Sequence, residues 1–207
     1  NYLWSIKDQT PLFHNILTSL IARLDVHSVD WIGTSMGGLL GMEIAAQKAS
    51  PIQRLILNDI GPFVSGASRQ ANAALANAAG EYETEAEAIA FVLETKKAFG
   101  PFTEEAAHKF ALDSILRSSD GKWRMHYDPM ITHSRKKLDT DLWDAWKRIC
   151  CPVLTIWGEE STLLSEETVQ KMRSIGPKTN LLSMPAIGHC PGLTSSIEID
   201  TIKNFLN

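Results

Sequence analysis

The strongest constraint on the fold is a set of short, uninterrupted apolar runs, each of which ends in turn-forming residues. Residues 54–62 are RLILNDIGP, and residues 151–160, CPVLTIWGEE, repeat this design. A third and weaker case is TNLLSMP at residues 179–185. A continuous apolar run of this length is typical of a strand that is covered on both faces, as the strands of parallel sheets are. These runs predict the inner strands of a parallel sheet.

Segments with helical periodicity lie before, between and after these runs. Residues 10–24 place leucine or isoleucine at every fourth position, and residues 36–49 are apolar nearly all round, as in a buried helix. Two further helices are predicted at residues 165–173 and 195–206. Because strands and helices alternate, the outer parts of the chain predict an α/β fold, with a mostly parallel sheet flanked by helices.

The middle of the chain follows a different pattern, with helices and no buried strand run. Thr84 and Glu87 form a capping box, which predicts a helix directly after Thr84. The acidic stretch at residues 81–87 is expected to be a solvated face and not a binding site. We therefore expect a helical cap at residues 63–147, inserted in a core that is made of residues 1–62 and 148–207.

The composition argues against several classes of partner. The formal net charge is −4 and the longest basic cluster is the RKK of residues 135–137, so a nucleic acid, which needs a basic face, is not expected. No apolar run approaches the roughly 18 residues of a membrane-spanning helix, so no membrane partner is expected. The chain has no HExxH and no CxxC, so neither a metal nor an organic cofactor is predicted.

The cysteines indicate a reducing compartment. Two of the three, Cys150 and Cys151, are adjacent, which makes a poor disulfide framework. Reduced thiols in a cytoplasmic protein are the preferred interpretation. Cys190 is expected to provide small packing volume and not a reactive thiol. The oligomeric state does not follow from the sequence.

One serine lies in a cluster of glycines between a predicted strand and a predicted buried helix. Residues 33–37 are GTSMG, which fits G-x-S-x-G, and the strand–turn–helix context is the one that this motif requires. The glycines at positions 33 and 37 are expected to relieve crowding where the strand turns into the helix, with Ser35 held in strained geometry and its hydroxyl exposed. The Met36 N–H, at the amino end of the helix, could face a developing oxyanion.

These segments resemble the α/β-hydrolase superfamily, and the resemblance covers nearly the whole chain. The fifth strand, nucleophile elbow and following helix of that family are similar to VDWIGTSMGGLLGMEIA, its sixth strand to LILNDIGP, its seventh to CPVLTIWGEE and its histidine loop to PAIGHCPGL. DGKWRMHYDP at residues 120–129 resembles a segment of carboxylesterase-like members. The resemblance implies an α/β-hydrolase fold with a helical cap and a serine hydrolase activity. The SMGG elbow also occurs in carbon–carbon bond hydrolases of this fold.

The resemblance also implies a base for the serine. A serine hydroxyl is a poor nucleophile at neutral pH and needs a histidine to take its proton. His189 lies in IGHCPGL, where the family carries its base, and it follows the serine and the candidate acids in the expected chain order.

The acid that would orient His189 departs from the family pattern. Most members carry an aspartate three or four residues beyond the glycine that ends strand seven, but Ser161 and Thr162 stand at those positions here. Asp59, at the end of the preceding strand, is preferred, because the carboxyl end of a strand points to the crevice in which such sheets bind ligands. Glu160, in the strand-seven loop, remains the alternative.

The expected activity is hydrolysis of an ester-like bond in a small, largely apolar substrate through an acyl-enzyme. The candidate lining residues of the substrate pocket are Trp123, Tyr127, Trp143 and Trp146, although each could also pack the cap on the sheet. Two alternatives remain open: a carbon–carbon bond hydrolase, or a ligand-binding relative without turnover. By resemblance, the chain looks truncated before the segment with which it opens, or its front half lies on another polypeptide. That front half usually supplies a second oxyanion donor.

Overall fold

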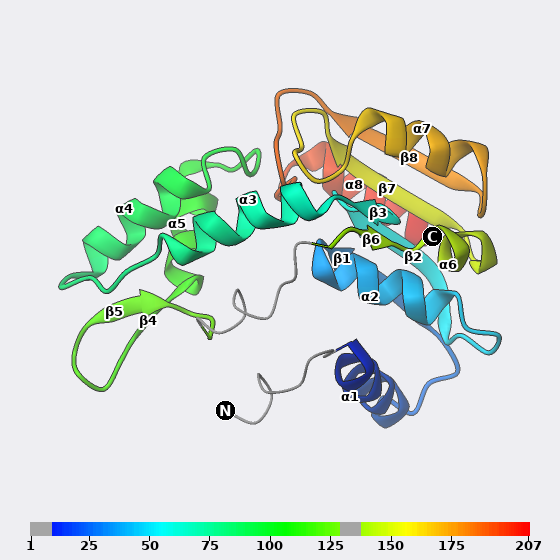
Figure 1. The fold of residues 1–207 in the computed structure, drawn as a ribbon, viewed down its shortest axis with the longest axis horizontal. Helices are drawn as coiled ribbons and strands as arrows, with labels where there is room; N and C mark the ends of the chain where they lie inside the picture. Colours follow the sequence, from blue (N-terminus) through cyan, green and yellow to red (C-terminus); the bar gives the residue numbers. More distant parts are fainter. Residues whose placement is uncertain (1–9, 129–137) are drawn as a thin grey trace.

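A parallel sheet in the order β1-β2-β7-β8 organises the computed structural model, which describes residues 10–128 and 138–207. The inner strands are β2 (Ile52–Asn58) and β7 (Val153–Gly158), and the outer strands are β1 (Val29–Thr34) and β8 (Thr179–Met184). The two strongest apolar runs thus form the inner strands, and the predicted parallel α/β sheet is confirmed. Figure 1 shows the sheet with helices in front of it and behind it.

The predicted helices around the sheet are also confirmed, with limits that differ by a few residues. They are α1 (Thr10–Arg23), α2 (Met36–Ala45), α7 (Glu166–Ser174) and α8 (Ser196–Leu206). Side chains of Ser165 and Ser195 cap α7 and α8 by accepting a backbone N–H three residues further on. These caps explain why both helices begin where the sequence predicts.

Successive residues of the inner strands face different helices. Leu55 and Leu57 are fully buried in the core cluster that contains side chains of α2 and α7. Ile56, between them, is fully buried in a second cluster, against Ile202 and Phe205 of α8. Because side chains alternate between the two faces of a strand, a strand that is covered on both faces must be apolar at every position.

The segment between β2 and β7 contains helices and two small antiparallel sheets. Its elements are β3 (Phe63–Val64), α3 (Gly66–Asn77), α4 (Glu85–Thr95), α5 (Glu104–Asp113), β4 (Ile115–Arg117), β5 (Trp123–Met125), β6 (Thr140–Asp141) and α6 (Trp143–Arg148). The strands are β3 paired with β6 and β4 paired with β5. The sequence predicts the helical character but not these strands, because two or three residues are too short to show a period of two.

The outer part of this segment has a small core of its own. Ala88 and Val92 of α4 and Ala111 of α5 are fully buried, and they pack with Ile115 of β4. In Figure 1, α4, α5 and the β4–β5 hairpin lie together to one side of the sheet. These elements therefore share a small hydrophobic cluster that is distinct from the two clusters of the main sheet.

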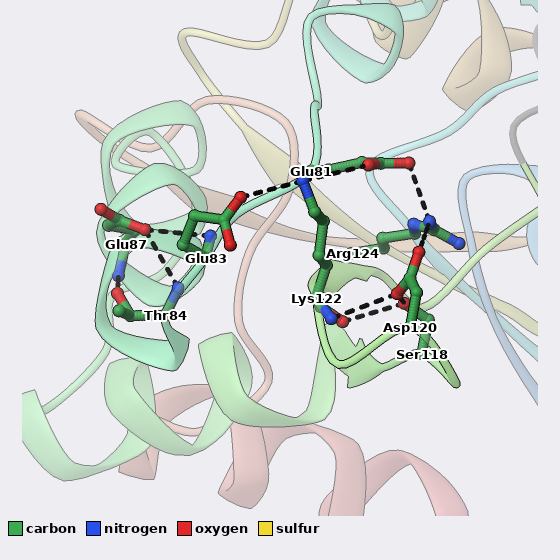
Figure 2. Close-up of polar contacts among 8 residues, drawn as sticks. All are labelled: Glu81, Glu83, Thr84, Glu87, Ser118, Asp120, Lys122 and Arg124. Carbon is green, nitrogen blue, oxygen red and sulfur yellow. Dashed lines mark hydrogen bonds and ion pairs between the residues drawn. The ribbon is translucent and has the colours of Figure 1, made fainter.

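The acidic stretch at residues 81–87 is exposed, and it is tied to the β4–β5 hairpin. Lys122 Nζ lies 2.9 Å from a carboxylate oxygen of Glu83, and an Arg124 terminal nitrogen lies 2.8 Å from Glu81. Figure 2 shows these two basic side chains between Glu81, Glu83 and Asp120. Such exposed ion pairs each contribute little to stability. The DGKWR part of the carboxylesterase-like segment therefore forms a hairpin and its salt bridges.

The last helix before β7 belongs with the main core. Trp146 of α6 is fully buried in the cluster of β2 and α2, and its indole N–H donates to the carbonyl of Ile175 at 2.8 Å. On this contact we propose that α6 is part of the core. The limits predicted for the two parts, residues 63–147 for the cap and 1–62 with 148–207 for the core, otherwise remain a prediction.

The RKK of residues 135–137 and Pro129 of the DGKWRMHYDP segment lie outside the described residues. Within residues 10–128 and 138–207, no helix combines the length and the apolar character that crossing a membrane requires.

Candidate active site

Ser35 lies at a sharp turn between β1 and α2, in a backbone conformation that side chains rarely adopt. Its φ is 50° and its ψ is −116°, and it occupies the N-cap position of α2 without capping the helix through its side chain. The N–H of Ser35 donates to the carbonyl of Asn58, at the end of β2, at 3.3 Å. A non-glycine residue in this region of φ costs free energy that the surrounding structure must supply, and such residues concentrate at functional sites.

The glycine two residues before Ser35 is required by a close approach of the backbone. A Cβ atom at Gly33 would lie within 2.6 Å of backbone atoms of Gly37 and Gly38. At Gly37, however, a Cβ would meet no described atom within 4 Å, which differs from the expected relief of crowding there. The second crowded position is Gly38, where a Cβ would overlap the Ile60 side chain. The tight pair is therefore formed by Gly33 and Gly38.

Met36 is the first residue of α2, directly after Ser35. The N–H groups of Gly38 and Leu39 already donate to the Ser35 carbonyl, at 3.0 and 3.1 Å. The N–H of Met36 belongs to the first turn, where a helix offers its donors no acceptor of its own. Its position next to Ser35 is the one that an oxyanion donor needs.

Asp59 and His189, which are 130 positions apart in the sequence, lie in direct contact. His189 Nδ1 lies 2.7 Å from Oδ2 of Asp59, and the Asp59 side chain is fully buried. Asp59 directly follows β2, and its N–H donates to the Ile156 carbonyl of β7 at 2.8 Å. The alternative acid, Glu160, is exposed. The contact that the assignment of Asp59 requires is therefore present.

The remaining hydrogen-bond donors to Asp59 come from β7 and the loop that follows it. The N–H of Gly158 donates to Oδ1 at 2.9 Å, and the Ser161 hydroxyl donates to Oδ2 at 2.6 Å. Ser161 Oγ in turn accepts the N–H groups of Leu163 and Leu164, both at 3.1 Å. From the sequence alone, Ser161 is only a residue that cannot be the acid. The structure shows that its hydroxyl instead holds the carboxylate of Asp59.

We predict that Ser161→Ala lowers kcat by about 10-fold and leaves KM nearly unchanged. A hydrogen bond to a charged group contributes about 1.5–3 kcal/mol, and its loss would let the Asp59 carboxylate turn away from His189. Steady-state kinetics on a chromogenic ester measures this, with urea unfolding as the check on stability. Ser161→Thr retains a hydroxyl and is the matched control. An unchanged kcat in Ser161→Ala would show that the hydroxyl has a structural role alone.

Asn58, the residue before Asp59, joins the serine turn to the histidine loop. Its side chain is buried, and Nδ2 donates to Oγ1 of Thr34 at 3.1 Å and to the carbonyl of Pro191 at 3.0 Å. Thr34 precedes Ser35, and Pro191 lies two residues after His189. Asn58 therefore contacts both the turn that carries Ser35 and the loop that carries His189, and Asp59 contacts His189 itself.

The histidine loop is also fastened to the chain between α4 and α5. Backbone hydrogen bonds join Gly188 to Ala98 at 2.9 Å and Gly100 to Cys190 at 3.2 Å. The ring of Phe99 lies edge-on to the His189 ring, with 6.1 Å between their centroids. The loop that carries His189 is thus held to the segment between α4 and α5 by backbone hydrogen bonds and by this ring contact.

Cys190, next to His189, has a thiol that stays protonated at neutral pH. Burial, and then the negative charge of Asp59, raise the pKa of this thiol to about 12. Because the thiolate is the nucleophilic form of cysteine, this thiol is inert under ordinary conditions. The buried position agrees with the expected packing role.

The four candidate lining residues do not gather in one place. Trp146 is fully buried in the main core, so it packs the fold and lines no open pocket. Trp123, in β5, packs in the small core of α4 and α5. Trp143, in α6, lies under Lys171 Nζ at 4.1 Å from the ring centroid and lines a surface cavity of about 700 Å³ with His14 and Glu43. Figure 1 shows β5 and α6 on opposite sides of the β1–α2 junction. Tyr127 is half-buried, and burial raises the pKa of its hydroxyl.

Comparison with known proteins assigns the chain to a family. The family model described as "Alpha/beta hydrolase family" matches residues 6–198, so the chain belongs to this family of hydrolases. It is 32% identical over 206 residues to the 3-hydroxybutyrate-oligomer hydrolase of Cupriavidus necator, covering 94% of this chain and 70% of that protein.

Solved structures show the same similarity. A putative hydrolase from Rickettsia typhi matches with a TM-score of 0.89 and 30% identity, covering 99% of this chain and 70% of that one. An alpha/beta hydrolase from Novosphingobium aromaticivorans matches with a TM-score of 0.82 and 27% identity, covering 96% and 72%. The resemblance that the sequence motifs suggest is thereby confirmed at the level of the family and the fold.

Proposed function

We propose that the protein is a serine ester hydrolase with Ser35 as nucleophile, His189 as base and Asp59 as the acid that orients His189. The observation that carries the proposal is the 2.7 Å contact between His189 Nδ1 and the buried Asp59. With Nδ1 donating to the carboxylate, Nε2 is the nitrogen that can accept a proton. Ser35, in the strained turn between β1 and α2, carries the hydroxyl whose proton such a base would accept.

The proposed reaction has two stages. His189 Nε2 takes the proton of the Ser35 hydroxyl as the oxygen attacks the ester carbonyl carbon, and the Met36 N–H donates to the oxygen that becomes negative. The C–O bond to the alcohol then breaks, and His189 returns the proton to the departing oxygen. In the second stage His189 takes a proton from water, the hydroxide attacks the acyl carbon, and Ser35 leaves with a proton from His189. Asp59 stays ionised and stabilises the imidazolium in both stages.

The name of a curated relative narrows the choice of substrate. That relative is a 3-hydroxybutyrate-oligomer hydrolase and is 32% identical to this chain. Such an oligomer is a chain of ester bonds between short hydroxy acids, which is a small and partly apolar substrate, with one free carboxylate at its end. We propose short hydroxyacyl esters of this kind as the substrates to test first.

The test is labelling with a fluorophosphonate probe, which reacts with activated serines. We expect the folded wild-type protein to be labelled on the peptide that contains Ser35, and Ser35→Ala to remain at background. Circular dichroism of both proteins checks that they are folded. Folded wild-type protein that takes no label would remove the proposal and favour a ligand-binding relative. Labelling without ester turnover, together with cleavage of a vinylogous diketone, would favour the carbon–carbon bond hydrolase instead.

A further inference from the structure

Lys96 is a half-buried cation at the end of α4, next to the segment that is hydrogen-bonded to the loop that carries His189. It ends α4 at the C-cap position, where its N–H donates to the carbonyl of Val92 at 2.9 Å. Its ammonium lies over the ring of Phe99, 4.8 Å from the centroid. That same ring touches the His189 ring edge-on. One aromatic side chain therefore separates the ammonium from the proposed base.

The backbone holds this arrangement in place. The residues that directly follow Lys96 are bonded to the histidine loop, through Gly188 with Ala98 and Gly100 with Cys190. Gly192 adds a third bond, from its N–H to the Gly100 carbonyl at 2.8 Å. Because three backbone bonds join the two segments, the backbone that carries Lys96 is held close to the loop that carries His189.

The ammonium has no anionic partner among residues 10–128 and 138–207. Its neighbour Lys97 is exposed and pairs with Glu94 at 2.7 Å, whereas Lys96 takes part in no ion pair within the described part of the chain. Burial lowers the pKa of the Lys96 ammonium. The nearby Cys190 thiol is protonated at neutral pH, since its pKa is raised to about 12, and so it supplies no charge.

A purely structural role of Lys96 explains its place at the end of α4 but not the partial burial of its ammonium. A cation is favourable at the C-terminus of a helix, and a lysine chain can cover an aromatic ring. An exposed side chain such as that of Lys97 would satisfy the helix equally well and would keep its ammonium in water. Removing part of the water shell from a charge is costly unless an opposite charge replaces it. A bound anion next to His189 would do so.

We propose that Lys96 binds a carboxylate of the substrate, so that the enzyme prefers esters that carry a free carboxylate over neutral esters of the same length. This inference rests on the proposed function and names the substrate class of the same site. The ammonium would receive the carboxylate end of the chain while the ester carbonyl lies between Ser35 and His189. Carboxylate recognition by a partly dehydrated ammonium is stronger than the same contact in water.

The test compares two substrates that differ only in charge, the dimer of 3-hydroxybutyrate and the same dimer with its terminal carboxylate converted to a primary amide. In Lys96→Gln we expect kcat/KM for the acid to fall about 10-fold or more, mainly through KM, with the amide unaffected. Lys96→Arg keeps the positive charge and should retain most of the preference. Lys97→Gln, which removes the exposed neighbouring cation, is the matched control and should behave as wild type.

A binding measurement separates this inference from the proposed reaction. Calorimetric titration of the dimer acid into Ser35→Ala, with and without Lys96→Gln, reports recognition without turnover. Weaker binding of the acid in the double variant supports Lys96 even if no ester is cleaved, in which case only the proposed reaction fails. If Lys96→Gln lowers kcat/KM equally for the acid and the amide, the proposed role of Lys96 is wrong. The same holds if Lys96→Gln turns over both substrates as the wild type does. In either case the ester hydrolase proposal is unaffected.

Discussion

Asp59→Asn is expected to lower kcat by about 10⁴-fold, with little change in KM. An asparagine amide has the size of the carboxylate but can present an N–H to His189 Nδ1, which would favour the wrong tautomer of the ring. The negative charge that stabilises the imidazolium is lost as well. The geometry supports so large an effect, because Asp59 Oδ2 lies 2.7 Å from His189 Nδ1 and its side chain is fully buried. Steady-state kinetics on a chromogenic ester checks the value.

Glu160→Gln is the matched control for this prediction. Glu160 is exposed and contacts the histidine loop through its backbone N–H, which donates to the Ile187 carbonyl at 2.9 Å. Its side chain can therefore lose its charge without disturbing that bond, and we expect wild-type kinetics. The opposite pattern, with a large loss in Glu160→Gln and a small one in Asp59→Asn, would assign the acid to the loop after β7.

Gly33→Ala is expected to lower the free energy of unfolding by about 3 kcal/mol or to prevent folding altogether. The added methyl group would lie within 2.6 Å of backbone atoms of Gly37 and Gly38. Backbone atoms at the start of α2 cannot move aside as the end of a flexible side chain can. The helix would have to shift away from β1, and Ser35 would move with it. Urea unfolding measures the stability of any soluble variant, and fluorophosphonate labelling reports the state of Ser35.

Gly37→Ala provides the comparison within the same motif. Apart from its chain neighbours and the backbone of its own helix, a Cβ at this position of α2 would meet no described atom within 4 Å, and alanine favours a helix over glycine. We expect stability equal to that of the wild type or slightly higher. Equal destabilisation by the two substitutions would mean that the crowding at Gly33 does not control the turn. The pair therefore tests the geometry of the turn apart from the chemistry of Ser35.

The location of Asp59, the proposed acid, shows how residues from two neighbouring strand ends can contribute to one site. Asp59 supplies the carboxylate from the end of β2, and Ser161 supplies a hydrogen bond to it from the loop after β7. Parallel strands bring their carboxyl ends to the same edge, so neighbouring strand ends can exchange roles without changing where the carboxylate lies. The absence of an acid at position 161 is therefore compatible with Asp59 as the carboxylate that orients His189.

Local patterns in the sequence were sufficient for much of this description. The apolar runs at β2 and β7 and the capping box of Thr84 and Glu87 act within a few residues, and each appears in the structure as predicted. The β4–β5 hairpin was missed because its strands have three residues each, although the turn between them contains Asp120 and Gly121.

The sequence by itself determined the parallel sheet, the buried helix α2 and the strained turn at Ser35, because these depend on the pattern of neighbouring residues. Only the tertiary structure decided that Ser161 donates to Asp59, that Asn58 joins the serine turn to Pro191, and that Lys96 lies one ring from His189. The first two contacts join residues more than 100 positions apart, and the third depends on how a cap loop packs on the histidine loop. No local pattern encodes such distances, since the packing of the whole chain brings these side chains together.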